Sequence, residues 1–450
     1  MSNPEKINRR QFIKSAAVVG AGLTLVPATG CTQTATPKSD DLNIAIIGAG
    51  DQGQEHANTI LKMGKRARLN FKAVCDIWPY NRRKVVKRLK AYDHQPKEYE
   101  DFREMLDAEK DLDAVIIATP LFWHAEHTIA SMRAGLHVYC EKEMANTIEN
   151  AGKMVQASKE TGKLLQIGRQ RRSSSKYIHC ADKLLKEAKI LGRITAASGQ
   201  WNRGKQLDAG WPKKYALDAT TLGKYGYKSM HQLRNWKWYK GLGSGYIVEL
   251  GSHQIDVFNW FLGATPTAIL AAGGVDYYDK QTHQWPDNVM LIYEYKIGDR
   301  IVRASYQLLL SNSSEGYFTK FMGDEGTLVT SLTEGKTSVY REEWVPAENW
   351  KKWVDAGYLE QSGHGAHELD SDVSAVTGAT ASPTQYDLPS TTTASPKAQH
   401  LSNFFDAIRD KAKLNCPGEV AFKTAVTVLK INEAIKTGKK LTFKPEDFKV

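Results

Sequence analysis

The stretch Gly48-Ala49-Gly50-Asp51-Gln52-Gly53 has the spacing Gly-x-Gly-x-x-Gly and decides the fold of the first part of the chain. A mostly apolar run over 42–47 precedes it and predicts a strand, and a helical pattern over 54–63 follows it. In such a turn, glycines let the backbone tighten and approach a pyrophosphate, whose charge then lies at the N-terminus of the helix. The stretch therefore predicts the phosphate-binding turn of a dinucleotide site.

An acidic residue stands where the adenosine ribose of a dinucleotide would lie. Asp76 follows the second strand pattern, 69–75, and comes 23 residues after Gly53. A carboxylate at this place bonds the ribose hydroxyls and repels a 2′-phosphate, so the sequence favours NAD over NADP. Arg82 and Arg83 follow in the next helical pattern and are able to hold a phosphate, which leaves NADP as the alternative.

Strand and helix patterns alternate outward from this turn as far as residue 168. Alternation of strands with helices of about 10–15 residues is typical of βαβ units and of a doubly wound parallel sheet. We therefore predict an α/β fold that begins with an NAD-binding Rossmann domain over 41–168. Its strands are expected at 42–47, 69–75, 112–118, 137–140 and 164–168, and its helices at 54–63, 81–91, 124–134 and 148–161.

From residue 169 to 450 the pattern changes to alternating strands with longer connections, which predicts an α+β domain with a mostly antiparallel open sheet. We expect this domain to bind the substrate and to join copies of the chain into a homo-oligomer through its sheet. The segment 362–396 is rich in Ser, Thr, Ala, Gly and Pro and predicts a flexible insertion. Strands are expected at 195–201, 267–272, 288–295, 301–308 and 327–331, and helices at 401–411 and 419–437.

The N-terminal residues are expected to stay outside the fold. Paired arginines in Asn8-Arg9-Arg10-Gln11-Phe12-Ile13-Lys14 precede an apolar stretch, 16–27, that is too short to span a membrane. This arrangement is typical of a twin-arginine (Tat) signal peptide, here over 1–31, so we expect export to the periplasm. A disordered basic N-terminus is the alternative. Ala28-Thr29-Gly30-Cys31 is similar to a lipoprotein cleavage box, which predicts lipidation of Cys31 and membrane anchoring ahead of a polar linker, 32–40.

Composition and charge exclude several other classes of protein. The 450 residues include 61 Lys and Arg against 50 Asp and Glu, a net charge of +11, and 41% are hydrophobic, which indicates a globular protein. Five cysteines without a Cys-x-x-Cys pair argue against a disulfide scaffold and a zinc ribbon. His364 and His367 lack supporting carboxylates, so we expect no metal site. Much of the positive charge lies on the helix pattern 81–90, as a solvated face, and no motif indicates a nucleic-acid partner.

Two further segments carry a family resemblance. The first includes Ala118-Thr119-Pro120-Leu121-Phe122-Trp123-His124 and Cys140-Glu141-Lys142-Glu143, and the second is Gly243-Ser244-Gly245-Tyr246-Ile247-Val248-Glu249-Leu250-Gly251-Ser252-His253-Gln254-Ile255-Asp256. With the glycine turn, they make residues 42–450 resemble the Gfo/Idh/MocA oxidoreductases, the relatives of glucose-fructose oxidoreductase and inositol dehydrogenase. The resemblance implies an enzyme that transfers a hydride between NAD(P) and a secondary hydroxyl of a sugar.

The resemblance also implies the catalytic residues. Lys142 takes the place of the lysine in the family's Glu-Lys-Pro motif, beside the nicotinamide ring, while Glu143 replaces the proline. The family's Asp and His, one helical turn apart, correspond to Glu249 and His253, which then share one face of a helix. In one reading His253 is the general base and Lys142 polarises the hydroxyl oxygen, and in the other Lys142 is the base. Asp256 lies three residues beyond His253 and is expected to orient its imidazole.

The remaining site candidates follow strand ends or lie in a segment rich in tryptophan. Indole faces suit the apolar CH groups of sugar rings, although core packing is the commoner role of tryptophan. For Gln170 and Arg171, polar contacts between domains are the alternative role. Candidate cofactor-binding residues are Gly48, Gly50, Asp51, Gln52, Gly53, Asp76, Thr119, Pro120, Trp123, His124, Glu141, Lys142 and Gln170, and candidate substrate-binding residues are Arg171, Trp201, Trp236, Glu249 and His253.

These observations lead to one functional hypothesis and two alternatives. We predict an NAD-dependent oxidoreductase acting on a secondary hydroxyl of a sugar or glycoside, with C3 as a candidate position. Because free dinucleotide is expected to be scarce outside the cytoplasm, we expect a tightly held cofactor that is recycled within the site. The first alternative is an NAD-dependent glycosidase like the family's α-N-acetylgalactosaminidase branch, which Lys142 disfavours because that branch lacks the lysine. The second is a non-enzymatic cofactor- or sugar-binding lipoprotein.

Overall fold

The computed structural model describes residues 40–333, 335–362, 383–389 and 394–450. The Tat signal peptide predicted over 1–31, the lipidation site at Cys31 and nearly all of the linker 32–40 lie outside the described residues, as do His364 and His367. None of the described helices is both long and apolar enough to cross a membrane.

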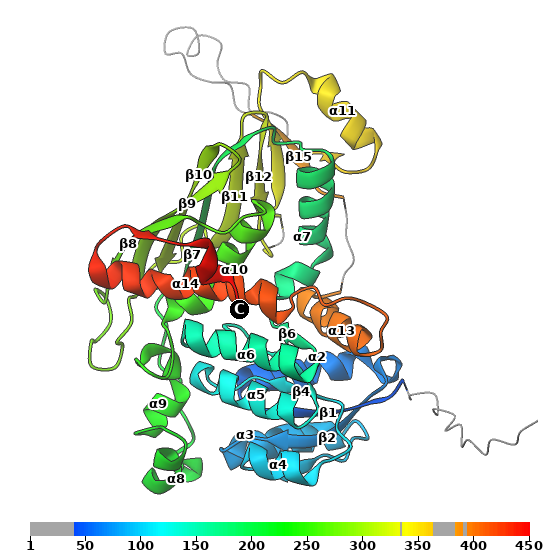
Figure 1. Cartoon of the computed structure of the whole chain (residues 1–450), viewed down its shortest axis with the longest axis vertical. Helices are drawn as coiled ribbons and strands as arrows, with labels where there is room; N and C mark the ends of the chain where they lie inside the picture. Colours follow the sequence, from blue (N-terminus) through cyan, green and yellow to red (C-terminus); the bar gives the residue numbers. More distant parts are fainter. Residues whose placement is uncertain (1–39, 334, 363–382, 390–393) are drawn as a thin grey trace, which may run out of the picture. The chain divides into compact units, whose positions relative to one another are not determined.

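The first sheet confirms the predicted Rossmann topology. Its strand order is β3-β2-β1-β4-β5-β6, and every neighbouring pair is parallel (Figure 1). The sequence did not predict β3, because this strand has only three residues and two of them are exposed and charged. The strands are β1 (Leu42–Ile47), β2 (Leu69–Cys75), β3 (Lys97–Tyr99), β4 (Ala114–Ile117), β5 (His137–Cys140) and β6 (Leu165–Ile167).

Alternate residues of β1 enter two different cores. Ala45 and Ile47 pack in the core on the face of α5 and α6, whereas Ile44 and Ile46 pack on the face of α2 and α3. This division follows from the two-residue period of a strand, and it buries both faces of the parallel sheet. The covering helices are α2 (Asp51–Met63), α3 (Pro79–Lys90), α4 (Phe102–Ala108), α5 (His124–Arg133) and α6 (Ile148–Thr161).

A helix from near the end of the chain also covers the first sheet. Helix α13 (Pro396–Ile408) contacts α2, and its residues Leu401, Phe404 and Phe405 belong to the same core as β1 (Figure 1). The chain therefore returns to the first sheet after it has formed the described strands of the second one other than β16. Sequence periodicity predicted a helix here but gave no information about which sheet it covers.

The second sheet is mostly antiparallel, as predicted. Its order is β14-β15-β13-β12-β11-β7-β10-β9-β8-β16, and only the central pair β7–β10 is parallel among the strands described. The strands of this sheet are β7 (Ile194–Asn202), β8 (Ala268–Gly274), β9 (Asn288–Ile297), β10 (Arg300–Leu309), β11 (Tyr317–Gly323), β12 (Gly326–Thr330), β13 (Ser338–Arg341), β14 (Glu360–Gln361), β15 (Thr384–Asp387) and β16 (Leu441–Thr442).

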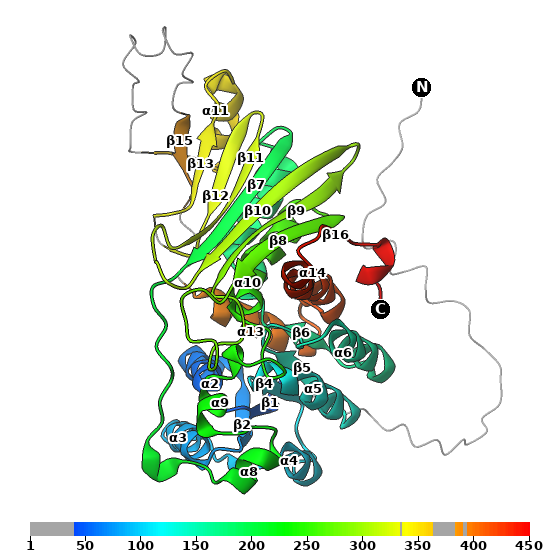
Figure 2. The same cartoon turned by 90° about the vertical axis from the view of Figure 1, so that its left-hand side faces the viewer.

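Helices cover one face of this second sheet. Helix α10 (Tyr246–Phe261) packs on β7, β10 and β11, and α14 (Gly418–Thr437) packs on β8 (Figure 2). The other face carries alternate residues of β8, β9 and β10 that include exposed apolar side chains. These are Leu270, Met290, Ile292 and Ile301.

The predicted flexible insertion 362–396 is partly ordered structure. Thr384–Asp387 forms β15, which pairs with β13, and α13 begins at Pro396. Residues 363–382 and 390–393 lie outside the described residues.

The long connection between β7 and α10 folds back on the first domain. It contains the short helices α8 (Ala219–Lys224) and α9 (Met230–Arg234), which lie beside the helices of the first sheet (Figure 2). The indole of Trp78 donates a hydrogen bond to the carbonyl of Tyr215 at 2.6 Å, and the hydroxyl of Tyr225 donates to Glu100 at 2.9 Å. These contacts hold the connection over the carboxyl ends of the parallel strands.

Candidate active site

The glycine turn is built by steric necessity. Gly48 has a φ of +96°, and a Cβ there would lie 2.6 Å from the carbonyl carbon of Ala118. A Cβ on Gly53 would lie 1.9 Å from the carbonyl oxygen of Gly48, so only glycine lets α2 start against β1. Gly50 instead faces open space at the start of α2 and lines the pocket with Asp51 and Gln52. The turn therefore leaves room for an anion at the helix N-terminus.

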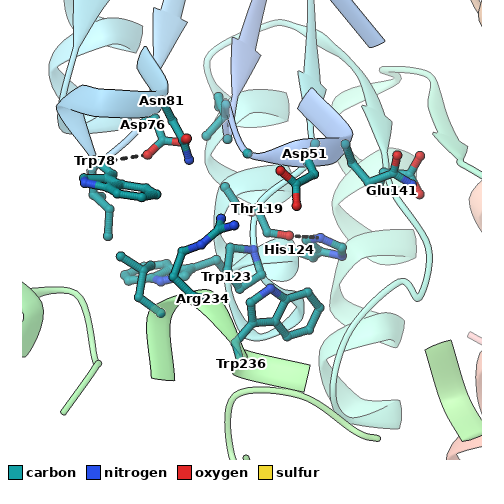
Figure 3. Close-up of a pocket in the computed structure, with 18 of the residues that line it drawn as sticks. Asp51, Asp76, Trp78, Asn81, Thr119, Trp123, His124, Glu141, Arg234 and Trp236 are labelled. Atoms are coloured by element: carbon teal, nitrogen blue, oxygen red, sulfur yellow. Dashed lines mark hydrogen bonds between the residues drawn. The ribbon is translucent and has the colours of Figure 1, made fainter. Parts of the chain in front are cut away.

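Asp76 lies at one end of the same pocket, next to Trp78 and Asn81 (Figure 3). Its carboxylate accepts hydrogen bonds from the backbone amides of Ala49 at 2.6 Å and Trp78 at 2.7 Å. Burial raises the pKa of Asp76 to about 6, although both amides act to lower it. A ribose hydroxyl donating to this carboxylate would stabilise its charged form.

Arg82 and Arg83, the two arginines for which NADP was kept as the alternative cofactor, contact other partners or solvent. Arg82 donates to the backbone carbonyl of Asp76 at 2.6 Å and to Glu98 at 3.3 Å, and Arg83 is exposed. Neither belongs to the described residues that line the pocket. This arrangement favours NAD.

The opposite wall of the pocket comes from the segment after β4. Thr119, Pro120, Trp123 and His124, which the sequence proposed as cofactor-binding candidates, all line the pocket. The imidazole of His124 lies 2.8 Å from the carbonyl oxygen of Thr119 (Figure 3) and 2.8 Å from that of Glu143. His124 therefore ties the end of β4 to the segment that carries Lys142.

Glu141 follows β5 and also lines the pocket. Its carboxylate lies 2.8 Å from Nε2 of His56 and accepts a hydrogen bond from the amide of Lys142 at 3.1 Å. Burial acts to raise the pKa of Glu141, but the hydrogen bond and charge of His56, with the charge of Lys142, lower it to about 2. His56 was not a candidate because a histidine within a helical pattern gives no local sign of its partner.

Lys142 and Glu249 meet where the two domains join. The ammonium of Lys142 donates a hydrogen bond to the carbonyl oxygen of Glu249 at 2.6 Å and lies 3.3 Å from its carboxylate. Both side chains are largely buried, with exposed fractions of 10% and 4%. A second ammonium, that of Lys237, lies 3.5 Å from the same carboxylate. Although burial acts to raise the pKa of Glu249, the two lysines lower it.

His253 lies one turn beyond Glu249 on α10, as the spacing predicted. Its ring is half-buried, and the ring centre lies 5.8 Å from that of Trp201. Burial, followed by the positive charges of Lys142 and Arg171, lowers the pKa of His253 well below 6.5. The imidazole is therefore neutral at neutral pH and able to accept a proton.

The prediction that Asp256 orients the imidazole of His253 was wrong. Asp256 accepts two hydrogen bonds from Arg172, at 2.9 and 3.0 Å, and one from the hydroxyl of Thr424 at 2.8 Å. A spacing of three residues puts Asp256 and His253 on one face of the helix, but that face also meets other segments of the chain. Here Arg172, from one of these segments, forms the stronger charged hydrogen bonds to the carboxylate of Asp256.

Glu143, which stands where the family has proline, forms a buried ion pair with Arg169. Their side chains approach to 2.5 Å, with exposed fractions of 0% and 1%, and the Lys142–Glu143 peptide bond is cis. Arg169 also donates to the carbonyl of Ser252, the residue before His253. The pair is thus linked to both catalytic candidates, because Glu143 follows Lys142 in the chain and Arg169 binds the residue before His253.

The remaining candidates separate into two groups. Trp236 lines the pocket (Figure 3), whereas Arg171, Trp201 and His253 are not among the described residues that line it. These three form a separate cluster, in which the ring of Trp201 lies between His253 and the guanidinium of Arg171, 5.8 Å from the first and 6.0 Å from the second. Gly53 packs against the backbone of Gly48 within the turn. Neither Gly53 nor Gln170 is among the described residues that line the pocket.

Apart from Trp236, which was a candidate, the sequence missed the pocket residues supplied by the connection between β7 and α10. Arg234 and Trp236 project into the pocket from this segment (Figure 3). The ammonium of Lys237, from the same segment, lies 3.5 Å from the carboxylate of Glu249. The density of tryptophan there was the only local signal, because the fold-back depends on contacts with distant residues such as Trp78. In the described part of the chain, no group of three or more His, Cys, Asp or Glu side chains is placed to hold a metal ion.

Comparison with known proteins agrees with this geometry. Residues 42–169 match the model of an oxidoreductase family with an NAD-binding Rossmann fold, and residues 188–443 match that family's C-terminal α/β domain. Residues 6–26 match the twin-arginine translocation signal sequence, which directs export across the cytoplasmic membrane.

The individual relatives match about a third of this chain. A glycosyl hydrolase family 109 protein of Parabacteroides distasonis is 35% identical over 177 residues, which cover 35% of this chain and 37% of that protein. An α-N-acetylgalactosaminidase of Tannerella forsythia is 33% identical over 180 residues, covering 35% and 38%. The chain thus spans less than two fifths of the length of these two curated relatives.

Solved structures share the fold over nearly the whole chain. The aldose-aldose oxidoreductase of Caulobacter crescentus, complexed with glycerol, superposes with a TM-score of 0.65 at 17% identity, covering 90% of this chain and 100% of that one. The two family matches, on a Rossmann sheet with its glycine turn intact, show that this chain belongs to the Gfo/Idh/MocA family of NAD-binding oxidoreductases.

Proposed function

We propose that this protein oxidises or reduces a secondary hydroxyl of a sugar or glycoside, with C3 as the candidate position and NAD as the cofactor. The observation that carries the proposal is the meeting of Lys142 with Glu249, one turn from His253, at the end of a dinucleotide pocket. A lysine and a neutral histidine near one another supply both an electrostatic stabiliser and a proton acceptor.

The residues present fit NAD. Gly50 leaves space at the N-terminus of α2 for the pyrophosphate, and Asp76 lies where it can accept bonds from the ribose. Thr119, Pro120 and Trp123 would hold the nicotinamide half, on the path to Lys142. When bound, NAD supplies the hydride acceptor or donor for the reaction.

The protein's own groups would manage the proton. His253 accepts the hydroxyl proton, because its lowered pKa keeps the imidazole unprotonated. Lys142 stabilises the negative charge that develops on the same oxygen. Glu249 holds Lys142 in place through its carboxylate and its carbonyl oxygen. In the other assignment Lys142 accepts the proton, and the variants described in the Discussion separate the two.

The pocket is also suited to retaining its cofactor. The connection between β7 and α10 supplies Leu207, Ala209, Arg234 and Trp236 to the pocket lining and is fastened to Trp78. A cofactor loaded before Tat export would stay under this cover and be recycled by alternate oxidation and reduction of sugars. The name of the Caulobacter crescentus neighbour, aldose-aldose oxidoreductase, describes such a pairing.

The experiment that tests this proposal begins with the purified, exported protein. Bound NAD should be released on denaturation, and a panel of sugars and glycosides should reduce it, read by absorbance of the reduced nicotinamide without added cofactor. A second sugar, as its keto form, should reverse the signal. Protein that emerges free of cofactor and turns over only with added NAD would contradict the recycling part of the proposal.

A glycosidase is the second candidate, because the two curated relatives carry glycosidase names. In this route His253 would assist a transient oxidation that allows the glycosidic bond to break by elimination, and the presence of Lys142 ranks this candidate second. Release of nitrophenol from nitrophenyl glycosides, with no net change in the bound cofactor, would establish this function instead.

We further propose a periplasmic location, a lipid anchor and a homo-oligomer. The lipid anchor would be Cys31, and a Cys31→Ser variant should then move from the membrane fraction to the soluble periplasmic fraction. The oligomer would form through the open face of the second sheet, where Leu270, Met290 and Ile292 are exposed. Light scattering of Ile292→Lys should show a smaller species than the unchanged protein.

A further inference from the structure

Three arginines follow β6 within four residues, and one of them differs from the others. Arg169 pairs with Glu143, and Arg172 makes two hydrogen bonds to Asp256. Arg171 is 3% exposed, and none of the described ion pairs or side-chain hydrogen bonds includes it. Its Nε is shielded from solvent without a hydrogen-bond partner. A buried guanidinium without an anion is costly, so its retention calls for an explanation.

The surroundings of Arg171 are aromatic. Its guanidinium lies over the rings of Tyr177, Trp201 and Tyr317, with distances to the ring centres of 5.6, 6.0 and 5.8 Å. Trp201 and Tyr317 stack on one another and are both partly exposed, so the cluster reaches the surface. Ring faces attract the cation but do not accept its N–H groups in line. As far as the described residues show, the donors of Arg171 therefore remain available to a bound group.

The cluster adjoins the reacting centre. Trp201 lies 5.8 Å from the ring of His253, and the charge of Arg171 acts on that imidazole strongly enough to lower its pKa. Around the same centre, two lysines, Lys142 and Lys237, share one carboxylate, that of Glu249. The described side chains at this end of the site thus carry more positive than negative charge.

We infer that the substrate is a sugar acid, whose carboxylate binds the guanidinium of Arg171 while its carbinol lies between His253 and Lys142. A carboxylate matches the planar fork of arginine with two parallel hydrogen bonds and would neutralise the buried charge. The aromatic walls of Trp201 and Tyr317 would flank the sugar ring. This inference rests on the proposed oxidoreductase function and names the chemical class of its substrate. Sulfated and phosphorylated sugars present a related anion and are separated by the test.

The test compares matched pairs of substrates on the holoenzyme. Methyl glucuronide is set against methyl glucoside, and galacturonate against galactose, with a sulfated and a phosphorylated sugar alongside. Reduction of bound NAD gives kcat/KM, and titration calorimetry gives Kd independently of turnover. We expect each acid to exceed its neutral partner by roughly 10- to 100-fold in kcat/KM, the range of a charged hydrogen-bonded contact.

Variants at the arginines locate the effect. Arg171→Met should remove the preference for the acid, with most of the change in KM and Kd, and Arg171→Lys should restore part of it. Arg172→Met is the matched control: it breaks the pair with Asp256, so it should lower thermal stability and affect acid and neutral sugars equally. Circular dichroism of each variant confirms that the fold is intact.

The outcomes separate the inference from the function on which it rests. Neutral sugars that react as well as their acids, or an acid preference that survives Arg171→Met, would overturn the inference and leave the oxidoreductase function standing. A preference for the sulfated or phosphorylated sugar would overturn the assignment of a carboxylate. If no sugar reduces NAD, the proposed function fails, and calorimetry still decides whether uronates bind through Arg171.

Discussion

The ammonium of Lys142 lies 3.3 Å from the carboxylate of Glu249 and donates a hydrogen bond to the carbonyl oxygen of the same residue at 2.6 Å. The two residues are 107 positions apart, one after a strand of the parallel sheet and the other on the helix beneath the second sheet. This contact orients the lysine at the junction of the two domains. It also places a charged group at the inner end of the dinucleotide pocket.

Replacing the two lysines at Glu249 should give unequal effects. Lys142→Met removes the group that stabilises charge on the substrate oxygen, so we expect the rate of bound-cofactor reduction to fall by roughly 10²- to 10⁴-fold. Lys237→Met removes a more exposed cation, which lies 3.5 Å from the same carboxylate, and should cost less than about tenfold. Stopped-flow absorbance measures both. Equal losses in the two variants would argue against a special role for Lys142.

The pH dependence of the reaction should reflect the lowered pKa of His253. Since burial and nearby cations hold this pKa well below 6.5, the imidazole stays in its proton-accepting form as the pH falls from about 7.5 to 6. We therefore expect kcat/KM to be flat in this window and to fall only at lower pH. His253→Gln should lower the rate by about 10²-fold or more across the whole window.

Two controls protect this pH experiment. Asp76, whose pKa is raised to about 6, titrates in the same range, so the measurement uses holoenzyme with its cofactor already bound. A fall in rate centred near pH 6.5 that His253→Gln abolishes would show instead that the imidazole has an ordinary pKa. If kcat/KM of the His253→Gln variant equals that of the unchanged protein across this pH range, the general base is Lys142.

An added methyl group should affect two glycines of the same turn differently: at Gly53 it should lower the stability of the fold, and at Gly50 it should weaken NAD binding. In Gly53→Ala the new Cβ would lie 1.9 Å from the carbonyl oxygen of Gly48, so the fold itself should lose about 3 kcal/mol or more. In Gly50→Ala the methyl meets no protein atom within 4 Å, and the φ of −67° suits alanine. That methyl would instead occupy the cofactor's space and weaken NAD binding by roughly tenfold or more.

These two variants are compared as apo proteins, because bound cofactor adds stability by mass action. Urea unfolding gives the free energy of unfolding, and calorimetry gives the affinity for NAD. An apo Gly50→Ala protein that unfolds as readily as Gly53→Ala would contradict the assignment of Gly50 to the cofactor's space.

Breaking the buried pair behind the active site should destabilise the protein. Of the described carboxylates, Glu143→Gln leaves Arg169 with that of Asp256, which is more distant at 3.9 Å, and we expect a loss of about 3 kcal/mol in the free energy of unfolding. The matched control is Glu149→Gln, which removes an exposed pair with Lys153 and should leave the urea midpoint almost unchanged. A Glu143→Gln protein as stable as the control would show that Asp256 suffices for Arg169.

The sequence by itself determined the parts of this protein that depend on local spacing. Glycines at 48, 50 and 53 between a strand and a helix are enough to predict the turn, because steric limits there act between neighbours. Alternating strand and helix patterns predicted the parallel sheet. A spacing of four residues placed Glu249 and His253 on one face of α10, because a helix repeats every 3.6 residues.

Only the tertiary structure decided which charges meet. It gave Asp256 to Arg172 instead of His253, paired Glu143 with Arg169, and left Arg171 without an anion among the described side chains. It also folded the connection that carries Lys237 over the pocket and returned α13 to the first sheet. The physical reason is that an ion pair depends on distance through space, and the partners here are distant along the chain. Local periodicity fixes which face a side chain occupies, but it carries no information about what another segment brings to that face.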